Sequence, residues 1–363
     1  MVFLNIYLDN LYLYKDFEIN FTYPRKLSNS TIDSEYLNNF PNFKYRKVNI
    51  IMGANSSGKT SLGRIMMNLQ NLLAKKELNN IPFNKVNNKK KVAKIKVDFV
   101  SKEYLYRYEL TFNNQALKEE IVFKTKLQKN DSYQTAVKRL KLINKAINPQ
   151  SIQEMELGRN NFNFGWYYSF AMLTDNQKIT VDKINSEILT RILKGFDCTI
   201  KEVNKVPKSS NSFNIVFLNG DNILIKDGQI VPKDKERISS GTYESIRIAT
   251  IISEMINEER NYFIDENIVH SHTELEKAVL SLMIDLLHQD SQLFFTTHNT
   301  DILDMNLPAH TIQFLTNKMG KIQVFDVFQK FNKSDRSLRN FIENDIFNTL
   351  PDTDFILEIL KNE

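Results

Sequence analysis

The sequence is poor in cysteine and has no long apolar run. Its 363 residues include one cysteine, Cys198, which excludes an internal disulfide framework and any zinc or iron–sulfur site built from several cysteines. No stretch approaches the roughly 18 consecutive apolar residues that a membrane-spanning helix needs. Residues 1–6 lack the basic region and apolar run of a signal peptide. These absences predict a cytoplasmic protein that does not act in a membrane.

The composition is that of a globular protein with a substantial core. Hydrophobic residues make up 42% and charged residues 25%, which excludes collagen-like, mucin-like and wholly disordered chains. The formal net charge is +5, but residues 71–150 alone carry 18 Lys and Arg against 7 Asp and Glu. This local excess indicates either a solvated lysine-rich insertion or a surface for nucleic acid or an acidic partner.

Hydrophobic periodicity predicts an α/β chain. Apolar alternation over 17–21 and the apolar run 48–52 predict strands, and the spacing of apolar residues after Lys59 predicts an amphipathic helix. More strands are predicted within 93–124, and a hairpin is predicted around Asn219-Gly220.

A segment with mostly helical spacing of apolar residues separates two parts of this α/β core. Residues from about 127 to 196 have mostly helical spacing, and Gly195 is a plausible helix stop. The chain is therefore predicted to consist of a first core segment, 1–124, a helical insertion, 125–200, and a second core segment, 201–363.

The most specific motif lies between the predicted strand 48–52 and the helix that follows it. It fits G-x-x-x-x-G-K-[ST], in which glycines let the backbone wrap a phosphate at the positive end of a helix. In this pattern Lys59 reaches the β- and γ-phosphates and the Thr60 hydroxyl binds Mg²⁺. The predicted nucleotide-binding residues here are Gly53, Ala54, Asn55, Ser56, Ser57, Gly58, Lys59, Thr60 and Ser61.

Two adjacent carboxylates follow the apolar stretch 261–264. Placing Asp265 and Glu266 at the end of a buried strand is costly unless they have a role, although an acidic turn is the simpler explanation. Beside a phosphate loop, we expect Asp265 to hold Mg²⁺ and Glu266 to orient or deprotonate the attacking water.

Two further segments precede and follow the carboxylates. Ser239, Ser240 and Gly241 begin a predicted helix, where serine and glycine are also ordinary helix caps. His298 ends another apolar strand, so we expect it near the same phosphate. His270 and His272 have a metal-ligand spacing, but no third ligand is apparent.

Taken in order, these four motifs resemble those of an ATP-binding-cassette (ABC) ATPase. The resemblance implies an α/β fold, an ABC ATPase head with a mixed sheet and flanking helices, here carrying an inserted helical element. It identifies 53–61 as Walker A, and it implies ATP and Mg²⁺ as cofactors and ATP hydrolysis as the reaction. By the same likeness, the signature motif is Ser239, Ser240 and Gly241, the Walker B aspartate and catalytic glutamate are Asp265 and Glu266, and the switch histidine is His298. The signature reads Ser-Ser-Gly-Thr in place of Leu-Ser-Gly-Gly-Gln, and Gln115 is the candidate for the Q-loop glutamine.

The arrangement of the motifs narrows the resemblance. The opening strands, the segment 104–120 and Thr297-His298-Asn299-Thr300 resemble the AAA-family ATPases of bacterial anti-phage systems, among them the OLD-like group, the Septu ATPase and abortive-infection ATPases. That likeness implies a Rad50-like head that forms a homodimer or higher oligomer and acts as a nucleotide-driven switch or sensor. About 65 residues follow His298, too few for a Toprim nuclease, so a separate effector nuclease is expected.

Three other functions compete with a defence ATPase. A RecF/Rad50-like repair ATPase would use the basic region 71–150 to bind DNA. A transporter subunit would need a membrane partner, and the 180 positions between Lys59 and Ser239 exceed the usual insertion of such subunits. A scaffold that binds ATP without hydrolysing it would not need Glu266.

Overall fold

The computed structural model of the protein describes residues 1–23, 30–75, 77–149, 165–170, 186–207, 209, 212–226, 229–230, 234, 237, 239–266, 268 and 272–327. They fall into two compact units, which are described separately. The first comprises Met1–Tyr168, Asn261–Asp265 and Gln289–Glu363, and the second comprises Ser169–Arg260 and Glu266–His288. None of the helices in these ranges is long and apolar enough to cross a membrane.

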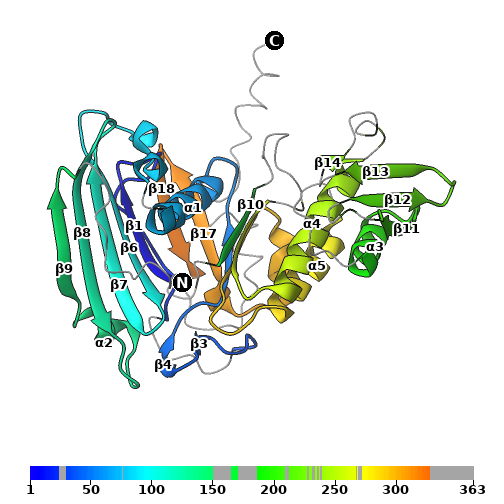
Figure 1. Cartoon of the computed structure of the whole chain (residues 1–363). Helices are drawn as coiled ribbons and strands as arrows, with labels where there is room; N and C mark the ends of the chain where they lie inside the picture. The colour runs from blue at the N-terminus through cyan, green and yellow to red at the C-terminus, as the bar shows by residue number, and fades with distance from the viewer. Residues whose placement is uncertain are drawn as a thin grey trace, which may run out of the picture. The chain divides into compact units, whose positions relative to one another are not determined.

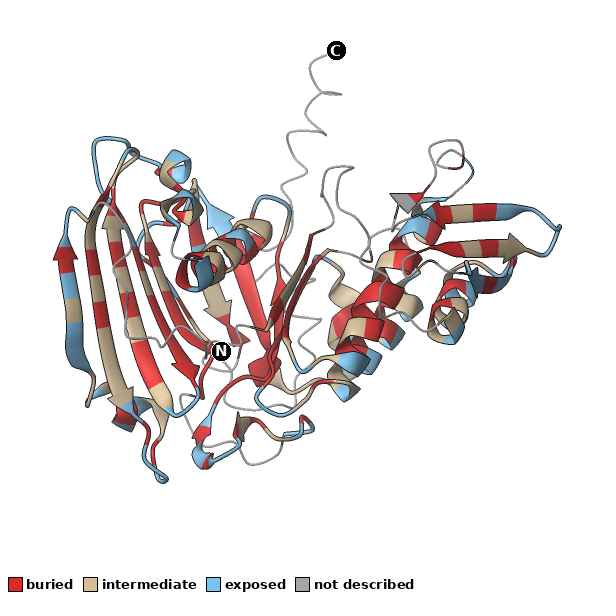
Figure 2. Ribbon diagram, viewed as in Figure 1, coloured by how far each residue is buried: buried red, intermediate tan, exposed pale blue. Residues whose placement is uncertain are grey.

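An antiparallel sheet forms one layer of the first unit (Figure 1). Its strands alternate buried and more exposed residues, as Figure 2 shows, because one face packs on the core and the other faces outward. In spatial order the strands are β2 (Phe17–Asn20), β1 (Val2–Asp9), β6 (Ala93–Ser101), β7 (Tyr104–Phe112), β8 (Leu117–Lys126) and β9 (Lys141–Ile147).

A second sheet forms the centre of the first unit. Three of its strands, β15, β16 and β5, have every residue buried, as expected of a largely parallel sheet covered on both faces. In spatial order the strands are β10 (Trp166–Phe170), β15 (Asn261–Asp265), β16 (Leu293–Thr297), β5 (Val48–Met52), β17 (Ile312–Lys318) and β18 (Lys321–Asp326).

Helix α1 (Lys59–Lys75) follows β5 and packs on this sheet through a close approach. A Cβ atom on Gly63 would lie only 2.3 Å from the ring of Phe263 in β15, so glycine is required there. The two sheets are joined by Gln292, whose side chain accepts from Phe3 N at 2.8 Å and donates to Phe3 O at 2.9 Å. These contacts hold the phosphate-loop motif between a buried strand and a packed helix.

Short elements complete the described part of the first unit. They are β3 (Tyr36–Leu37), β4 (Phe40–Lys44), η1 (Leu78–Asn80), η2 (Phe83–Lys85), α2 (Tyr133–Val137), η4 (Thr300–Met305) and η5 (Ala309–Thr311).

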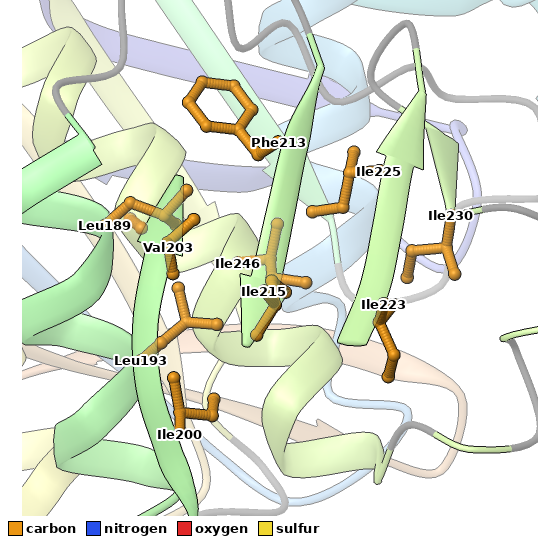
Figure 3. Packing of buried hydrophobic residues seen from close by; sticks show 11 residues of the cluster. Leu189, Leu193, Ile200, Val203, Phe213, Ile215, Ile223, Ile225, Ile230 and Ile246 are labelled. Carbon is orange, nitrogen blue, oxygen red and sulfur yellow. The ribbon is translucent and has the colours of Figure 1, made fainter. Parts of the chain in front are cut away.

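The second unit packs helices against a small antiparallel sheet. Figure 3 shows its core, in which Leu189 and Leu193 of one helix and Ile246 of another meet the apolar face of the sheet. The predicted hairpin is confirmed, with Gly220 at φ +87° in the turn, a conformation that suits glycine. The elements are α3 (Ser186–Phe196), β11 (Ile200–Lys205), β12 (Phe213–Phe217), β13 (Asn222–Lys226), β14 (Gln229–Ile230), α4 (Ser240–Asn257) and α5 (Thr273–Asp285).

The prediction of a mostly helical segment over 127–196 is wrong for two stretches. Residues 141–147 form β9 and residues 166–170 form β10. In β9 only Ala146 is buried, so the strand has no apolar alternation to distinguish it from a helix. The helical spacing that leads up to Gly195 is confirmed only in part, because α3 covers Ser186–Phe196 and 171–185 lie outside the described residues.

Candidate functional site

The loop between β5 and α1 has a backbone that few residue types can adopt. Gly53 has φ +153°, Ser56 +64° and Gly58 +103°. A Cβ atom on Gly53 would lie 2.2 Å from the carbonyl oxygen of Leu315, so only glycine fits against β17. The glycines of the motif are therefore required by close backbone packing within the first unit.

Lys59 lies at the start of α1 with its side chain folded into the loop. Its exposed fraction is 4%, and its Nζ donates to Gly53 O at 2.5 Å and to Ala54 O at 3.1 Å. The two carbonyl oxygens therefore hold the Nζ of Lys59 against the loop.

The next residue, Thr60, is joined to the carboxylate at the end of β15. Its hydroxyl donates to Asp265 Oδ2 at 2.7 Å, and the Thr296 hydroxyl of β16 donates to Asp265 Oδ1 at 2.6 Å. Asp265 is 3% exposed, so both carboxylate oxygens are oriented by buried or half-buried hydroxyl groups. The structure therefore brings together the two residues predicted to bind Mg²⁺.

These residues fit a phosphate group with a bound divalent cation. The hydroxyl of Ser57 is buried in the loop and has no hydrogen-bond partner among the described residues. A buried polar atom of this kind is costly unless a ligand satisfies it. Ser57 lies two residues before Lys59 at the N-terminus of a 17-residue helix, where backbone N–H groups favour anions.

Two contacts that support the loop come from residues that the motif does not contain. The Tyr14 hydroxyl donates to Gly58 O at 2.7 Å, and Asn317 Nδ2 donates to Ser56 O at 3.2 Å. Burial, followed by the charges of Tyr12 and Asp265, raises the pKa of Tyr14 well above its ordinary value. Its hydroxyl therefore stays protonated and remains a donor. No local sequence signal marks Tyr14 or Asn317, because each lies far along the chain from the loop.

Strand register places three of the predicted segments at one edge of the central sheet. Asp265 pairs with Thr296, and Thr297 pairs with Met52, so β15, β16 and β5 end together. His298, which directly follows β16, is exposed. Its neighbour Thr297 accepts the Asn299 N–H at 3.0 Å, which shapes the turn after the strand.

Glu266 directly follows Asp265 and has an unusual backbone. Its φ is +47°, in the left-handed region that a residue with a side chain rarely adopts. Such conformations cost free energy and occur in turns as well as at functional sites, and ten other non-glycine residues of the described chain also have a positive φ.

The Ser-Ser-Gly segment belongs to the second unit and begins α4. Ser239 caps the helix: its hydroxyl accepts Thr242 N at 3.0 Å, and Thr242 Oγ1 donates to Asp197 Oδ2 at 3.1 Å. Ser240 is the first residue of the helix. A Cβ atom on Gly241 would have no neighbour closer than 3.9 Å, so this glycine leaves open space. The capping role expected of such residues is confirmed.

The other predicted residues are the Q-loop candidate Gln115 and the histidine pair His270 and His272. Gln115 is exposed in the turn between β7 and β8, where its backbone N–H donates to Asn113 Oδ1, and no contact joins it to the loop among the described residues. His272 caps α5 by accepting Glu274 N at 3.3 Å, and His270 lies outside the described residues. In the part of the chain that the structure describes, no group of three His, Cys, Asp or Glu residues could hold a metal ion.

Comparisons with solved structures show similarity in fold. An SMC head bound to the C-winged helix domain of ScpA is 12% identical with a TM-score of 0.52, over 91% of this chain and 100% of that one. A second similar structure is an Smc head domain with an extended coiled coil, bound to the C-terminal domain of ScpA derived from Pyrococcus furiosus. It is 11% identical with a TM-score of 0.51, over 94% of this chain and 98% of that one. At these identities the likeness concerns the fold alone. No curated protein matches the chain.

One protein family matches the sequence itself. Its description is "AAA domain, putative AbiEii toxin, Type IV TA system", and the match covers residues 48–304, from β5 into η4. This range contains the loop 53–61, the Ser239–Gly241 segment, the carboxylates and His298. Because the match spans more than half of the chain, the protein belongs to this AAA-domain family, and its fold is that of an ABC ATPase head of the SMC type.

Proposed function

We propose that the protein binds ATP with Mg²⁺ at residues 53–61 and hydrolyses it to ADP and phosphate. The observation that supports this best is the 2.7 Å hydrogen bond between Thr60 Oγ1 and Asp265 Oδ2. It joins the end of the loop to the carboxylate at the end of β15, which β16 separates from β5 in the sheet, as a shared Mg²⁺ site requires. A cation bound there would neutralise charge on the phosphates.

The other loop residues would contact the phosphates themselves. Lys59 can exchange its two carbonyl acceptors for phosphate oxygens, and the Ser57 hydroxyl would gain a partner. The backbone N–H groups of the loop would add further donors. The loop thus has the cationic and neutral donors that a triphosphate needs.

The catalytic roles are assigned to Glu266 and His298. Glu266 would act as the general base toward water, and its strained backbone conformation is consistent with a side chain held for chemistry. His298 would contact the γ-phosphate from the turn after β16. Both assignments are proposals that depend on the position of these residues at strand ends.

Replacing Lys59 with Ala tests nucleotide binding. We expect at least a hundredfold loss of affinity for ATP in isothermal titration calorimetry, about 2.7 kcal/mol. Lys75→Ala is the matched control, because Lys75 is exposed at the other end of the same helix. Tight ATP binding by Lys59→Ala would contradict the assignment of the loop.

We further propose that two heads enclose ATP head to tail. Ser239, Ser240 and Gly241 of one subunit would face the γ-phosphate bound by the other, so hydrolysis requires association. Blocking hydrolysis with Glu266→Gln should trap this state, and its mass in solution should double only with Mg-ATP. A variant that binds ATP and stays monomeric would contradict the shared site.

In the cell, the ATP state would serve as a switch in bacterial anti-phage defence and control a separate effector nuclease. The support is the family description, which names a putative toxin of a toxin–antitoxin system. Expression together with the neighbouring genes should lower phage plating, and Lys59→Ala should abolish that protection. Equal protection by the wild-type protein and by Lys59→Ala would show that defence does not depend on nucleotide binding at this loop.

A second candidate function is DNA binding by a repair ATPase. The supporting observation is that the lysine-rich turn 88–92 has a defined shape. Asn10 Nδ2 donates to the carbonyls of Asn88, Lys91 and Val92, each at 3.1 Å, and Asn10 Oδ1 accepts Asn88 N at 2.8 Å. Exposed lysines on an ordered turn suit contacts to a phosphate backbone.

DNA affinity measured at several salt concentrations tests this alternative. Neutralising Lys89, Lys90 and Lys91 together should lower the affinity and reduce the slope of log K against log salt by about 3. A control that neutralises the exposed residues Lys201, Lys205 and Lys226 should not. Equal binding by both triple variants would rule out this turn as the DNA contact.

A further inference from the structure

The outermost strand of the antiparallel sheet, β9, has an unpaired edge. In the sheet order it lies beside β8 and ends the series, and no described strand pairs with its other side (Figure 1). Unpaired edges of this kind pair readily with other chains, so they are usually short, charged, bulged or covered.

The exposed side chains of β9 are largely apolar. Leu142 is 55% exposed, Ile143 46% and Ile147 61%, and Figure 2 shows the exposure along the strand. Three of the ten exposed large hydrophobic residues of the described chain therefore lie in one strand of seven residues. A partner that covers this strand would remove apolar surface from water.

The pairing register shows which of these side chains share a face. Leu142, Lys145 and Ile147 stand opposite Phe123, Ile121 and Glu119, which alternate along β8 and so lie on one face. A β-bulge leaves Ile143 without an opposite residue, so Leu142 and Lys145 share this face although they are three positions apart. This face of β9 therefore presents an apolar, a basic and an apolar side chain in sequence.

The segment that contains β9 carries charge of one sign. Residues 132–149 contain four basic residues and no acidic residue. Arg139 is paired with Asp131 and Lys145 with Glu119, whereas Lys138 and Lys141 have no ion-pair partner among the described residues. An acidic ligand would be attracted and a second copy of the same strand repelled.

The backbone offers donors along the same edge. Asn148 N donates to Lys118 O of β8 at 2.8 Å, so the alternating ladder directs the N–H groups of Ala146 and Asn144 toward β8 as well. The N–H groups of Lys145 and Ile147 then point away from β8. A nucleic acid has no strand to pair with them, whereas an extended peptide does.

We propose that the outer edge of β9 is a docking strand for an extended segment of a partner protein. The segment would add to the sheet and present an acidic residue to Lys145, with apolar residues on either side of it toward Leu142 and Ile147. The inference concerns this surface alone and does not depend on the proposed ATP chemistry.

Fluorescence anisotropy with a defined probe tests the proposal on the full chain. The probe is a labelled, blocked peptide of sequence Thr-Val-Thr-Glu-Thr-Val-Thr, and its control has lysine in place of glutamate. We expect the glutamate peptide to bind at least about tenfold more tightly than the lysine peptide. Equal affinities, or no binding of either, would overturn the proposal.

Two variants of Lys145 separate backbone pairing from charge. Lys145→Pro removes the outward N–H without removing a bond to β8, and it should bind the probe at least about tenfold more weakly than Lys145→Ala. The Ala variant loses the same ion pair to Glu119, so it controls for that loss. Equal binding by the two variants would overturn strand addition.

A charge reversal at Lys145 distinguishes a loss of binding from a loss of folding. Lys145→Glu should reverse the preference and favour the lysine peptide, a gain that misfolding cannot produce. The mass of the wild-type chain is measured alongside. A dimer that Lys145→Pro dissociates would show that a second copy occupies the edge, which would also overturn the proposal.

Discussion

At the scale of single residues, support for the phosphate loop comes from distant side chains. Tyr14 is fully buried, and its hydroxyl bonds to Gly58 O, an atom that also accepts Leu62 N at 2.9 Å in the first turn of α1. A Cβ atom on Gly58 would lie 2.9 Å from the same hydroxyl. Tyr14 therefore positions the point at which the loop becomes helix.

Replacing Tyr14 with Phe should remove the hydrogen bond to Gly58 O while the ring still fills its place in the core. The lost hydrogen bond should lower the free energy of unfolding by about 1 kcal/mol in urea titration, because a buried carbonyl keeps only one of its donors. ATP affinity should fall by about three- to tenfold.

Tyr7→Phe is the matched control for that experiment. The Tyr7 hydroxyl lies in β1 and donates to Asp16 Oδ1 at 3.2 Å in an exposed setting, so its loss should change neither quantity measurably. Unchanged ATP affinity in Tyr14→Phe would show that the tyrosine supports the fold alone.

At the scale of elements, helix α4 combines a structural and a proposed functional role in one residue. Ser239 caps the helix through Thr242 N, and it is also assigned to the nucleotide of a second subunit. The two roles make opposite demands on charge, since an N-cap tolerates a carboxylate and a phosphate site does not.

Two substitutions of Ser239 should separate these roles. Ser239→Ala should lower the free energy of unfolding by about 1 kcal/mol, because the Thr242 N–H loses its acceptor. Ser239→Asp should retain stability and abolish the ATP-dependent mass increase in the Glu266→Gln background, because its charge repels the γ-phosphate. An Asp variant that still associates would argue against the signature assignment, whatever the Ala variant does.

At the scale of the whole molecule, the core of the first unit contains several tyrosines that resist ionisation. Burial raises the pKa of Tyr14, Tyr45 and Tyr108, and it raises the pKa of Tyr106 to about 12. A tyrosine whose pKa is higher in the folded state stabilises the fold fully below its unfolded pKa of about 10. That stability is lost as the pH rises above this value.

We therefore expect cooperative alkaline unfolding above about pH 10. The tyrosinate absorbance of these buried residues should appear together with the loss of circular dichroism. Full ionisation of all 14 tyrosines with an intact dichroism spectrum would contradict the burial of these rings.

Much of the site could be predicted because its signals are local. Residues 48–75 contain an apolar strand, a glycine loop and an amphipathic helix in succession, and each step depends on neighbours in the chain. The same holds for Asp265 at the end of β15 and for the Asn219-Gly220 turn. The strand β9 was missed because an exposed edge strand lacks the apolar alternation that a half-buried strand shows.

The sequence by itself determined the family, the phosphate loop and the carboxylate that lies beside it, because these depend on residue types at short spacing. Only the tertiary structure decided which hydroxyl groups hold Asp265, that Tyr14 and Asn317 support the loop, and that β9 ends its sheet. These features depend on which strands pair and in what register. Such pairing is set by packing between segments that are far apart in the chain.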